Sequence, residues 1–111
     1  MQNKFLAFLG LVKKTGNVVE GYNKCEDAFK YKNKFYMVIF SNDISEKSRK
    51  NFIFLCDKNN IPYVQYYSKE ELGSALGRAE INVMAITDNN MAKKLKENFD
   101  SVMSQKTIGG E

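Results

Sequence analysis

The sequence contains no histidine and no tryptophan, and it has only two cysteines and one proline. Histidine is the side chain best suited to proton transfer near neutral pH, so its absence weighs against acid–base catalysis. Cys25 and Cys56 fit neither a metal-ligand spacing nor the C-x-x-C redox motif. Both lie on the apolar side of predicted helices. We therefore interpret them as reduced core residues and expect a cytoplasmic protein with no metal or cofactor.

Catalytic motifs are missing as well. The chain has no glycine-rich phosphate loop and no serine or cysteine in a nucleophile motif. Four carboxylates are expected near strand ends, where a pair could perform acid–base chemistry: Asp43, Glu46, Glu80 and Asp88. Asp88 is explained as a helix cap, and Glu46 by the first turn of a helix, where the dipole favours negative charge. We therefore expect a protein that is not an enzyme.

Positive charge is only mildly in excess. The 111 residues include 17 Lys and Arg and 13 Asp and Glu, which gives a net charge of +4. Such an excess favours contact with phosphate groups, although it is also a common background property. The apolar stretch 5–12 is too short to span a membrane, and no signal-peptide cleavage site follows it. We interpret it as a helix of the mature domain and expect no membrane association.

The first half of the chain alternates helical and strand patterns. Apolar residues over 5–12 have helical spacing, and residues 18–19 form a short strand pattern. Asn23, with Glu26 three residues later, resembles a capping box that begins a second helix. The uninterrupted apolar run 35–40 predicts a strand buried on both faces.

The second half continues this alternation. Ser45 is a candidate cap for a third helix, which must end before Pro62. Ser68 and Glu71 form a capping box for a short helix. Strand patterns over 63–67 and 83–87 precede the fourth and the last helix.

Helices and strands that alternate at short spacing predict an α/β protein with a four-stranded sheet between layers of helices. We expect one domain over residues 1–103. Residues 104–111 lack a pattern and predict a flexible tail.

Four short segments, in this order, resemble the motifs of a known family: GYN (21–23), SNDIS (41–45), IPYV (61–64) and LGSALG (72–77). They are similar to those of the kink-turn RNA-binding ribosomal proteins, the group that contains L7Ae and L30e. The closest likeness is the small bacterial branch of YlxQ-type proteins, and it covers approximately residues 5–95. The resemblance implies a three-layer α/β/α sandwich with a mixed sheet, and non-catalytic binding of RNA.

The segment Gly21-Tyr22-Asn23-Lys24 stands where a strand ends and a helix begins. A helix N-terminus binds phosphate readily, although a turn with a helix cap is the commoner explanation of such a segment. In the family, the matching helix N-terminus enters the major groove of the bent RNA, and its Asn, Glu and Lys read sheared G·A pairs. Gly21 and Asn23 match this pattern. Lys24 stands where the family has Glu, and Asp27 where it has Lys, so recognition of a standard kink-turn is left open.

The resemblance implies two further contact segments. Asn42 and Asp43 follow a predicted buried strand, and the Asn42 amide can exchange hydrogen bonds with base edges. An Asx turn that caps the next helix explains them equally well. The second segment contains Arg78, Glu80 and Ile81. In the family, an apolar residue of this loop covers a flipped-out nucleotide, a role open to Ile81, although Ile81 equally begins a strand.

Lys47 and Arg78 lie beside these segments and could hold phosphates, although a solvated helical surface is the default explanation for such charges. We expect a monomer that binds structured RNA, either ribosomal or another non-coding RNA, with the ribosome as one setting. The alternative is a protein-interaction module of the same fold that has lost its RNA contacts. The exchanged signs at Lys24 and Asp27 support that alternative.

Overall fold

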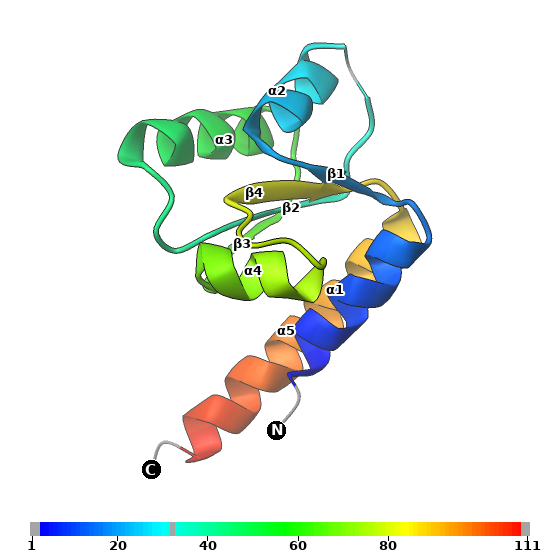
Figure 1. Cartoon of the computed structure of the whole chain (residues 1–111), viewed down its shortest axis with the longest axis vertical. Helices are drawn as coiled ribbons and strands as arrows, with labels where there is room; N and C mark the ends of the chain where they lie inside the picture. Colours follow the sequence, from blue (N-terminus) through cyan, green and yellow to red (C-terminus); the bar gives the residue numbers. More distant parts are fainter. Residues whose placement is uncertain (1–2, 32, 110–111) are drawn as a thin grey trace.

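The computed structural model describes residues 3–31 and 33–109, which form five helices and four strands. In chain order the elements are α1 (Lys4–Lys14), β1 (Val18–Glu20), α2 (Tyr22–Lys30), β2 (Met37–Phe40), α3 (Glu46–Lys58), β3 (Tyr63–Gln65), α4 (Lys69–Ala75), β4 (Val83–Ile86) and α5 (Asn89–Gly109). Helices cover both faces of the sheet, so the predicted three-layer α/β/α sandwich is confirmed (Figure 1).

Local side-chain chemistry fixes several helix starts. Ser68 and Glu71 form the predicted capping box at α4. The Ser45 hydroxyl accepts a hydrogen bond from the backbone N–H of Ser48 at the start of α3, and Asp88 Oδ2 accepts one from the N–H of Met91 in α5. These oxygens satisfy N–H groups that have no partner inside the helix.

The sheet is mixed, with strand order β1-β4-β2-β3. β4 pairs antiparallel with β1 on one side and with β2 on the other, while β2 and β3 run parallel. As a result, the C-terminal ends of β1, β2 and β3 and the N-terminal end of β4 meet at one edge. This edge lies to the left of the sheet in Figure 1.

Alternate residues of the central strands face two separate cores. Met37 and Ile39 of β2 belong to the core beneath α1, α4 and α5, whereas Val38 and Phe40 belong to the core beneath α2 and α3. All four residues of β2 are buried, as the apolar run predicted, and all four residues of β4 are buried as well. A strand buried on both faces needs a continuous apolar sequence, which explains why this run has no polar interruption.

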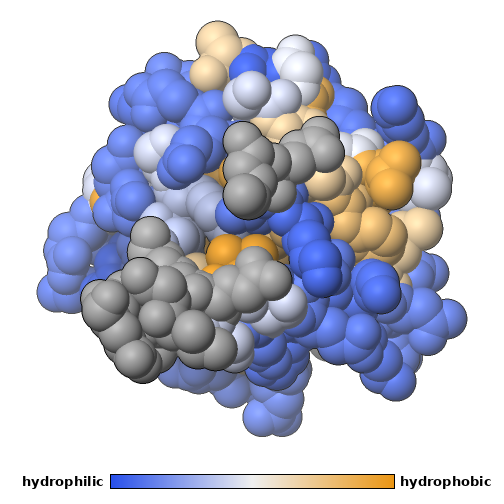
Figure 2. Space-filling model, turned by 90° about the horizontal axis from the view of Figure 1, so that it is seen from below, coloured by the Kyte–Doolittle hydropathy of each residue, from blue (hydrophilic) through white to orange (hydrophobic). Residues whose placement is uncertain are grey.

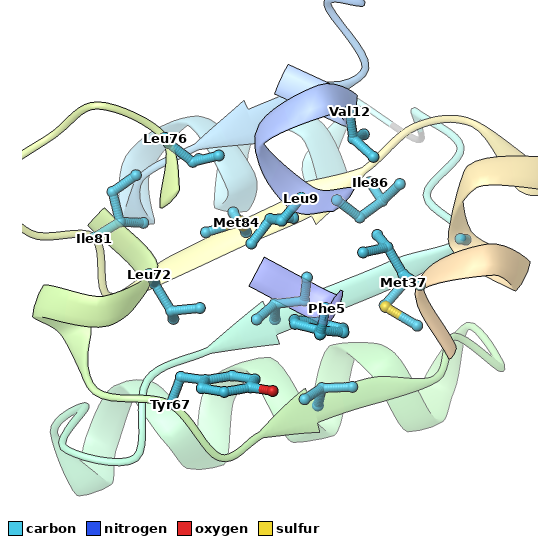
Figure 3. Close-up of a cluster of buried hydrophobic side chains, with 14 residues drawn as sticks. Phe5, Leu9, Val12, Met37, Tyr67, Leu72, Leu76, Ile81, Met84 and Ile86 are labelled. Atoms are coloured by element: carbon cyan, nitrogen blue, oxygen red, sulfur yellow. The ribbon is translucent and has the colours of Figure 1, made fainter. Parts of the chain in front are cut away.

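The core beneath α1, α4 and α5 is centred on aromatic packing. Phe5 stacks on Tyr67 with ring centroids 5.3 Å apart, and Phe99 meets Phe5 edge-on at 5.6 Å. Figure 3 shows Leu72 of α4 pointing into the same cluster. The Tyr67 hydroxyl lies within hydrogen-bond distance of the side-chain amide of Asn3, which caps α1.

Seen from below, the visible surface is mostly hydrophilic, with apolar areas near the centre and on the right of the view (Figure 2). Within the described residues, no helix combines the length and the apolar character that crossing a membrane requires.

The last helix is longer than its apolar pattern. α5 continues to Gly109, so the backbone is helical beyond Ser104, where the sequence pattern ends. Residues 110 and 111 of the expected tail lie outside the described residues, and its flexibility stays a prediction.

Candidate nucleic-acid interface

Gly21 ends β1 and caps α2 without a side chain. Its φ of 99° lies in a region that favours glycine, and its carbonyl accepts the N–H of Cys25. No side chain caps α2, so the N–H groups of its first turn are open to solvent or to a ligand. The capping box predicted from Asn23 and Glu26 is wrong, because the turn at Gly21 starts the helix at Tyr22 and places Asn23 inside the first turn.

The first turns of α2 carry both exposed and packed side chains. Asn23, Lys24 and Asp27 are exposed. Tyr22 instead packs edge-on against Phe52 of α3, with ring centroids 5.1 Å apart. Its hydroxyl also lies 3.3 Å from both Glu26 and Asn51. Tyr22 is therefore half-buried and joins α2 to α3.

Asn42 links the ends of β2 and β3. Its backbone N–H donates to the carbonyl of Tyr67 at 2.8 Å, and its side-chain Nδ2 donates to the carbonyl of Tyr66 at 2.8 Å. The Oδ1 atom accepts no hydrogen bond within the described part of the chain, so it remains an acceptor for a ligand. The side chain thus has a structural role as well as one open polar atom.

Asp43 lies beside the start of α4. A hydrogen bond from the Ser41 hydroxyl lowers the pKa of the Asp43 carboxyl, and the backbone N–H of Lys69, 3.3 Å from Oδ1, lowers it further. The Ser41 hydroxyl also lies 3.2 Å from Asn82 Oδ1. Because it has one proton, it donates either to the Asp43 carboxylate or to Asn82 at any one time. Asp43 therefore stays ionised and holds α4 next to the end of β2.

Arg78 is paired inside the protein. Its Nε donates to Glu20 Oε1 at 2.9 Å, while Lys13 Nζ lies 2.7 Å from Glu20 Oε2. Partial burial raises the pKa of Glu20, but the hydrogen bonds from Lys13 and Arg78 outweigh it and the pKa lies below its usual value. The Arg78 side chain remains 58% exposed, so a phosphate could reach it by competing with Glu20.

Ile81 does not present its side chain to solvent. It is 7% exposed and belongs to the core beneath α1, α4 and α5. Its backbone N–H donates to the carbonyl of Lys69 at 3.0 Å, which fixes the loop against α4. In this structure the Ile81 side chain therefore packs into the core just before β4. It is not placed on the surface, where it could cover a nucleotide. Glu80 is exposed and lies 3.8 Å from the Lys69 ammonium.

Gly73 explains much of the LGSALG segment. A Cβ atom on Gly73 would lie 2.6 Å from the Cα and 2.7 Å from the N of Glu80, so only glycine allows the loop to approach α4 this closely. Leu72 and Leu76 are core residues, and Gly77 has a φ of 74°. The LGSALG segment, one of the four that carry the resemblance, thus packs α4 against the 78–82 loop and so positions Arg78 and Glu80.

Short contacts bring the three predicted segments together. The Gly21 N–H donates to the Val83 carbonyl at 2.9 Å, and the Ser41 N–H donates to the Asn82 carbonyl at 2.8 Å. Arg78 reaches Glu20, and Asp43 reaches the start of α4. We call this region the polar edge: residues 20–27, 41–47, 69 and 78–82.

The polar edge carries no excess of positive charge. Its residues include four cations (Lys24, Lys47, Lys69 and Arg78) and six carboxylates (Glu20, Glu26, Asp27, Asp43, Glu46 and Glu80). Lys24, Lys47 and Asp27 form no ion pair within the described residues. Hydrogen-bonding groups, rather than net charge, therefore distinguish this edge.

Metal-ligand clusters and reactive thiols are not found in the described part of the chain. No group of three or more His, Cys, Asp or Glu side chains there could hold a metal ion. Burial raises the pKa of Cys25 to about 12, with a contribution from Cys56, and burial likewise raises the pKa of Cys56 to about 12. Both thiols are free and buried, as predicted, and stay protonated near neutral pH.

Comparisons with known proteins agree on one fold. Residues 3–96 match the ribosomal protein L7Ae/L30e/S12e/Gadd45 family. A protein of unknown function from Bacillus halodurans is similar with a TM-score of 0.83 and 25% identity, over 89% of this chain and 99% of that one. The 15.5-kD RNA-binding protein of Giardia lamblia is similar with a TM-score of 0.70 and 18% identity, over 87% of this chain and 85% of that one.

Proposed function

The chain belongs to the ribosomal protein L7Ae/L30e/S12e/Gadd45 family, and from this premise we propose that it is a non-catalytic RNA-binding protein. The observation that carries the proposal is the polar edge, where the uncapped N-terminus of α2 lies beside the ends of β2 and of the 78–82 loop. The RNA-binding protein of Giardia lamblia shares the fold, which supports the same class of ligand.

In the proposed docking mode, the first turn of α2 meets the RNA. The open N–H groups and the positive end of the helix dipole favour a phosphate there. Asn23 and Asn42 Oδ1 offer hydrogen bonds to base edges. Lys47 supplies a cation, and Arg78 supplies another when it exchanges Glu20 for a phosphate.

Lys24 and Asp27 disfavour recognition of a standard kink-turn RNA. Lys24 donates hydrogen bonds but accepts none, so it cannot receive the amino groups of paired guanines as a carboxylate does. Asp27 lies three residues further along α2, on the same side, and repels phosphate. We propose that this protein binds structured RNA but prefers a site other than the standard kink-turn.

Exchange of these two charges tests the docking mode. We expect Asp27→Lys to strengthen binding to a standard kink-turn about fivefold, since it removes a repulsion and adds an attraction worth about 1 kcal/mol at a solvated surface. Lys24→Glu in that background should increase the preference for the kink-turn over an unbent duplex.

A titration of each variant against both RNAs measures the effect. Glu97→Lys on α5 is the matched control, because it changes the charge equally at an exposed position away from the polar edge. Unchanged affinity in a folded Asp27→Lys variant would show that this face of α2 does not touch RNA.

A protein-interaction module is the second candidate, and the lack of excess positive charge at the polar edge favours it. Such a module would bind neither kink-turn RNA nor total cellular RNA in a mobility-shift assay. A cytoplasmic location, a monomeric state, ribosome association and membership of the YlxQ-type branch are further parts of our proposal. The extensive match to a bacterial chain supports the last of these.

A further inference from the structure

We propose that a second surface, at the end of the sheet opposite the polar edge, binds a further segment of RNA. It consists of two adjoining clefts beside the N-terminal end of β2. This inference rests on the proposed function, because it takes RNA as the ligand. We call it the lysine surface, after the five residues that define it: Lys30, Lys34, Lys58, Lys93 and Lys96.

The two clefts adjoin each other. The larger has a volume of about 1160 Å³ and lies between the C-terminal halves of α2 and α3. The smaller, of about 280 Å³, lies between α5 and the start of β2. Phe35, Tyr36 and Asn60 line both of them. A strand of four residues is about 13 Å long, so the five lysines lie at the other end of the sheet from the polar edge, and the two surfaces meet only at Glu26 and Asp27 of α2.

The lysine surface carries an excess of positive charge. Its lining includes five lysines and two carboxylates, Glu26 and Asp27, both on α2. Glu26 already accepts a hydrogen bond from Asn51 at 3.2 Å. Of the five lysines, only Lys96 forms an ion pair within the described residues, with Asp100 at 3.3 Å. At the polar edge, by contrast, carboxylates outnumber cations by six to four.

Helix stability explains only part of this set of lysines. Lys30 and Lys58 occupy the last turns of α2 and α3, where a cation favours the helix dipole. Lys34 lies outside any helix, and Lys93 and Lys96 lie in the second turn of α5, near the positive end of its dipole. Lys96 pairs with Asp100 one turn further along α5, which also favours the helix. Lys34 and Lys93 therefore call for another explanation.

The other lining groups favour RNA over an acidic peptide. Asn33 and Asn60 have side-chain amides that can donate to and accept from base edges. Tyr36 is half-buried between the clefts and offers an aromatic ring. Phosphates for the lysines, with bases for the amides and the ring, are the pattern of single-stranded RNA recognition.

The experiment uses three probes: a kink-turn RNA, the same RNA with a single-stranded uridylate extension, and the uridylate strand alone. The test variant combines Lys34→Gln, Lys58→Gln and Lys93→Gln. The control variant, Lys4→Gln with Lys50→Gln and Lys94→Gln, removes the same charge from exposed positions outside both clefts. Thermal unfolding of both variants checks that they fold.

We expect the extension to strengthen binding to the unaltered protein, and the test variant to lose this gain. Removing three phosphate contacts should reduce the slope of log K against log salt by about 2, and affinity for the extended probe about 100-fold at about 0.1 M salt. The control variant should retain the gain. If the protein bound the uridylate strand but did not bind the kink-turn RNA, the result would support the lysine surface and refute docking at the polar edge.

Three results would overturn the inference. The extension could add no affinity, or the control variant could lose as much as the test variant, which would make net charge the cause. Binding of polyglutamate but of no RNA probe would assign the surface to an acidic protein partner. If the kink-turn alone bound and the extension added nothing, only this inference would fail, and the proposed function would stand.

Discussion

For replacement of Gly73 by alanine, helix propensity and the packing in this structure predict opposite changes in stability. In an exposed helix, Gly→Ala stabilises a protein by up to about 1 kcal/mol, because alanine has the higher helix propensity. Gly73 lies inside α4 and is buried. On propensity alone, Gly73→Ala should therefore raise the free energy of unfolding.

The close approach of the 78–82 loop reverses this expectation. The new Cβ would lie 2.6 Å from Glu80 Cα, 2.7 Å from Glu80 N and 3.0 Å from the carbonyl carbon of Ala79. All three are backbone atoms, so relief requires a movement of the loop itself. The Arg78 N–H also donates to the Gly73 carbonyl at 2.8 Å, which ties the loop to the same turn of helix. Overpacking of this kind costs about 1–3 kcal/mol.

Urea denaturation measures the result, and we expect Gly73→Ala to lower the free energy of unfolding by about 1–3 kcal/mol. The control is Ser74→Ala, an exposed position in the same helix, which should change it by less than about 0.5 kcal/mol. RNA affinity of the folded Gly73→Ala variant should also fall, since Arg78 is displaced. A variant as stable as the parent would refute the close approach.

Two further predictions concern stability. Leu72 is fully buried, so Leu72→Ala should cost about 2–5 kcal/mol in urea denaturation; a variant that unfolded like the parent would contradict its place in the core. The lowered pKa of Glu20 means that its ion pairs stabilise the fold above the ordinary pKa of 4.5, and that this contribution is lost as pH falls below that value. The stability difference between the parent and Glu20→Gln should therefore shrink below about pH 4.5, and a constant difference across pH would exclude this linkage.

Elements that depend on local chemistry could be predicted from the sequence. The capping box of Ser68 and Glu71 needs only residues three apart, and the buried run over Met37–Phe40 needs only its own composition. The start of α2 could not be placed in this way, because Gly21 adopts a positive φ that competes with the Asn23 pattern. A capping sequence shows that a cap is available, but it does not show that the cap is used.

The details of the candidate site depend on contacts between distant residues. Glu20 and Arg78 are 58 residues apart, so their ion pair leaves no local signal. Ile81 and Tyr22 are apolar or aromatic residues in loops or first turns, and only the packing of α4 and α3 decides that they face inward. The Gly73 contact with Glu80 is of the same kind. A glycine inside an otherwise regular helix was the one available hint.

The place of β4 at the centre of the sheet has a consequence for folding. Within residues 3–31 and 33–109, β4 is the last strand, yet it is the only partner of β1 and joins it to β2. Until residue 86 has been synthesised, β1 has no neighbour, and β2 and β3 form only a two-stranded parallel pair, which is marginal in water. The N-terminal strand must wait while more than half of the chain is made. Pairing of Glu20 with Met84 then closes a long loop, which slows the folding of such topologies.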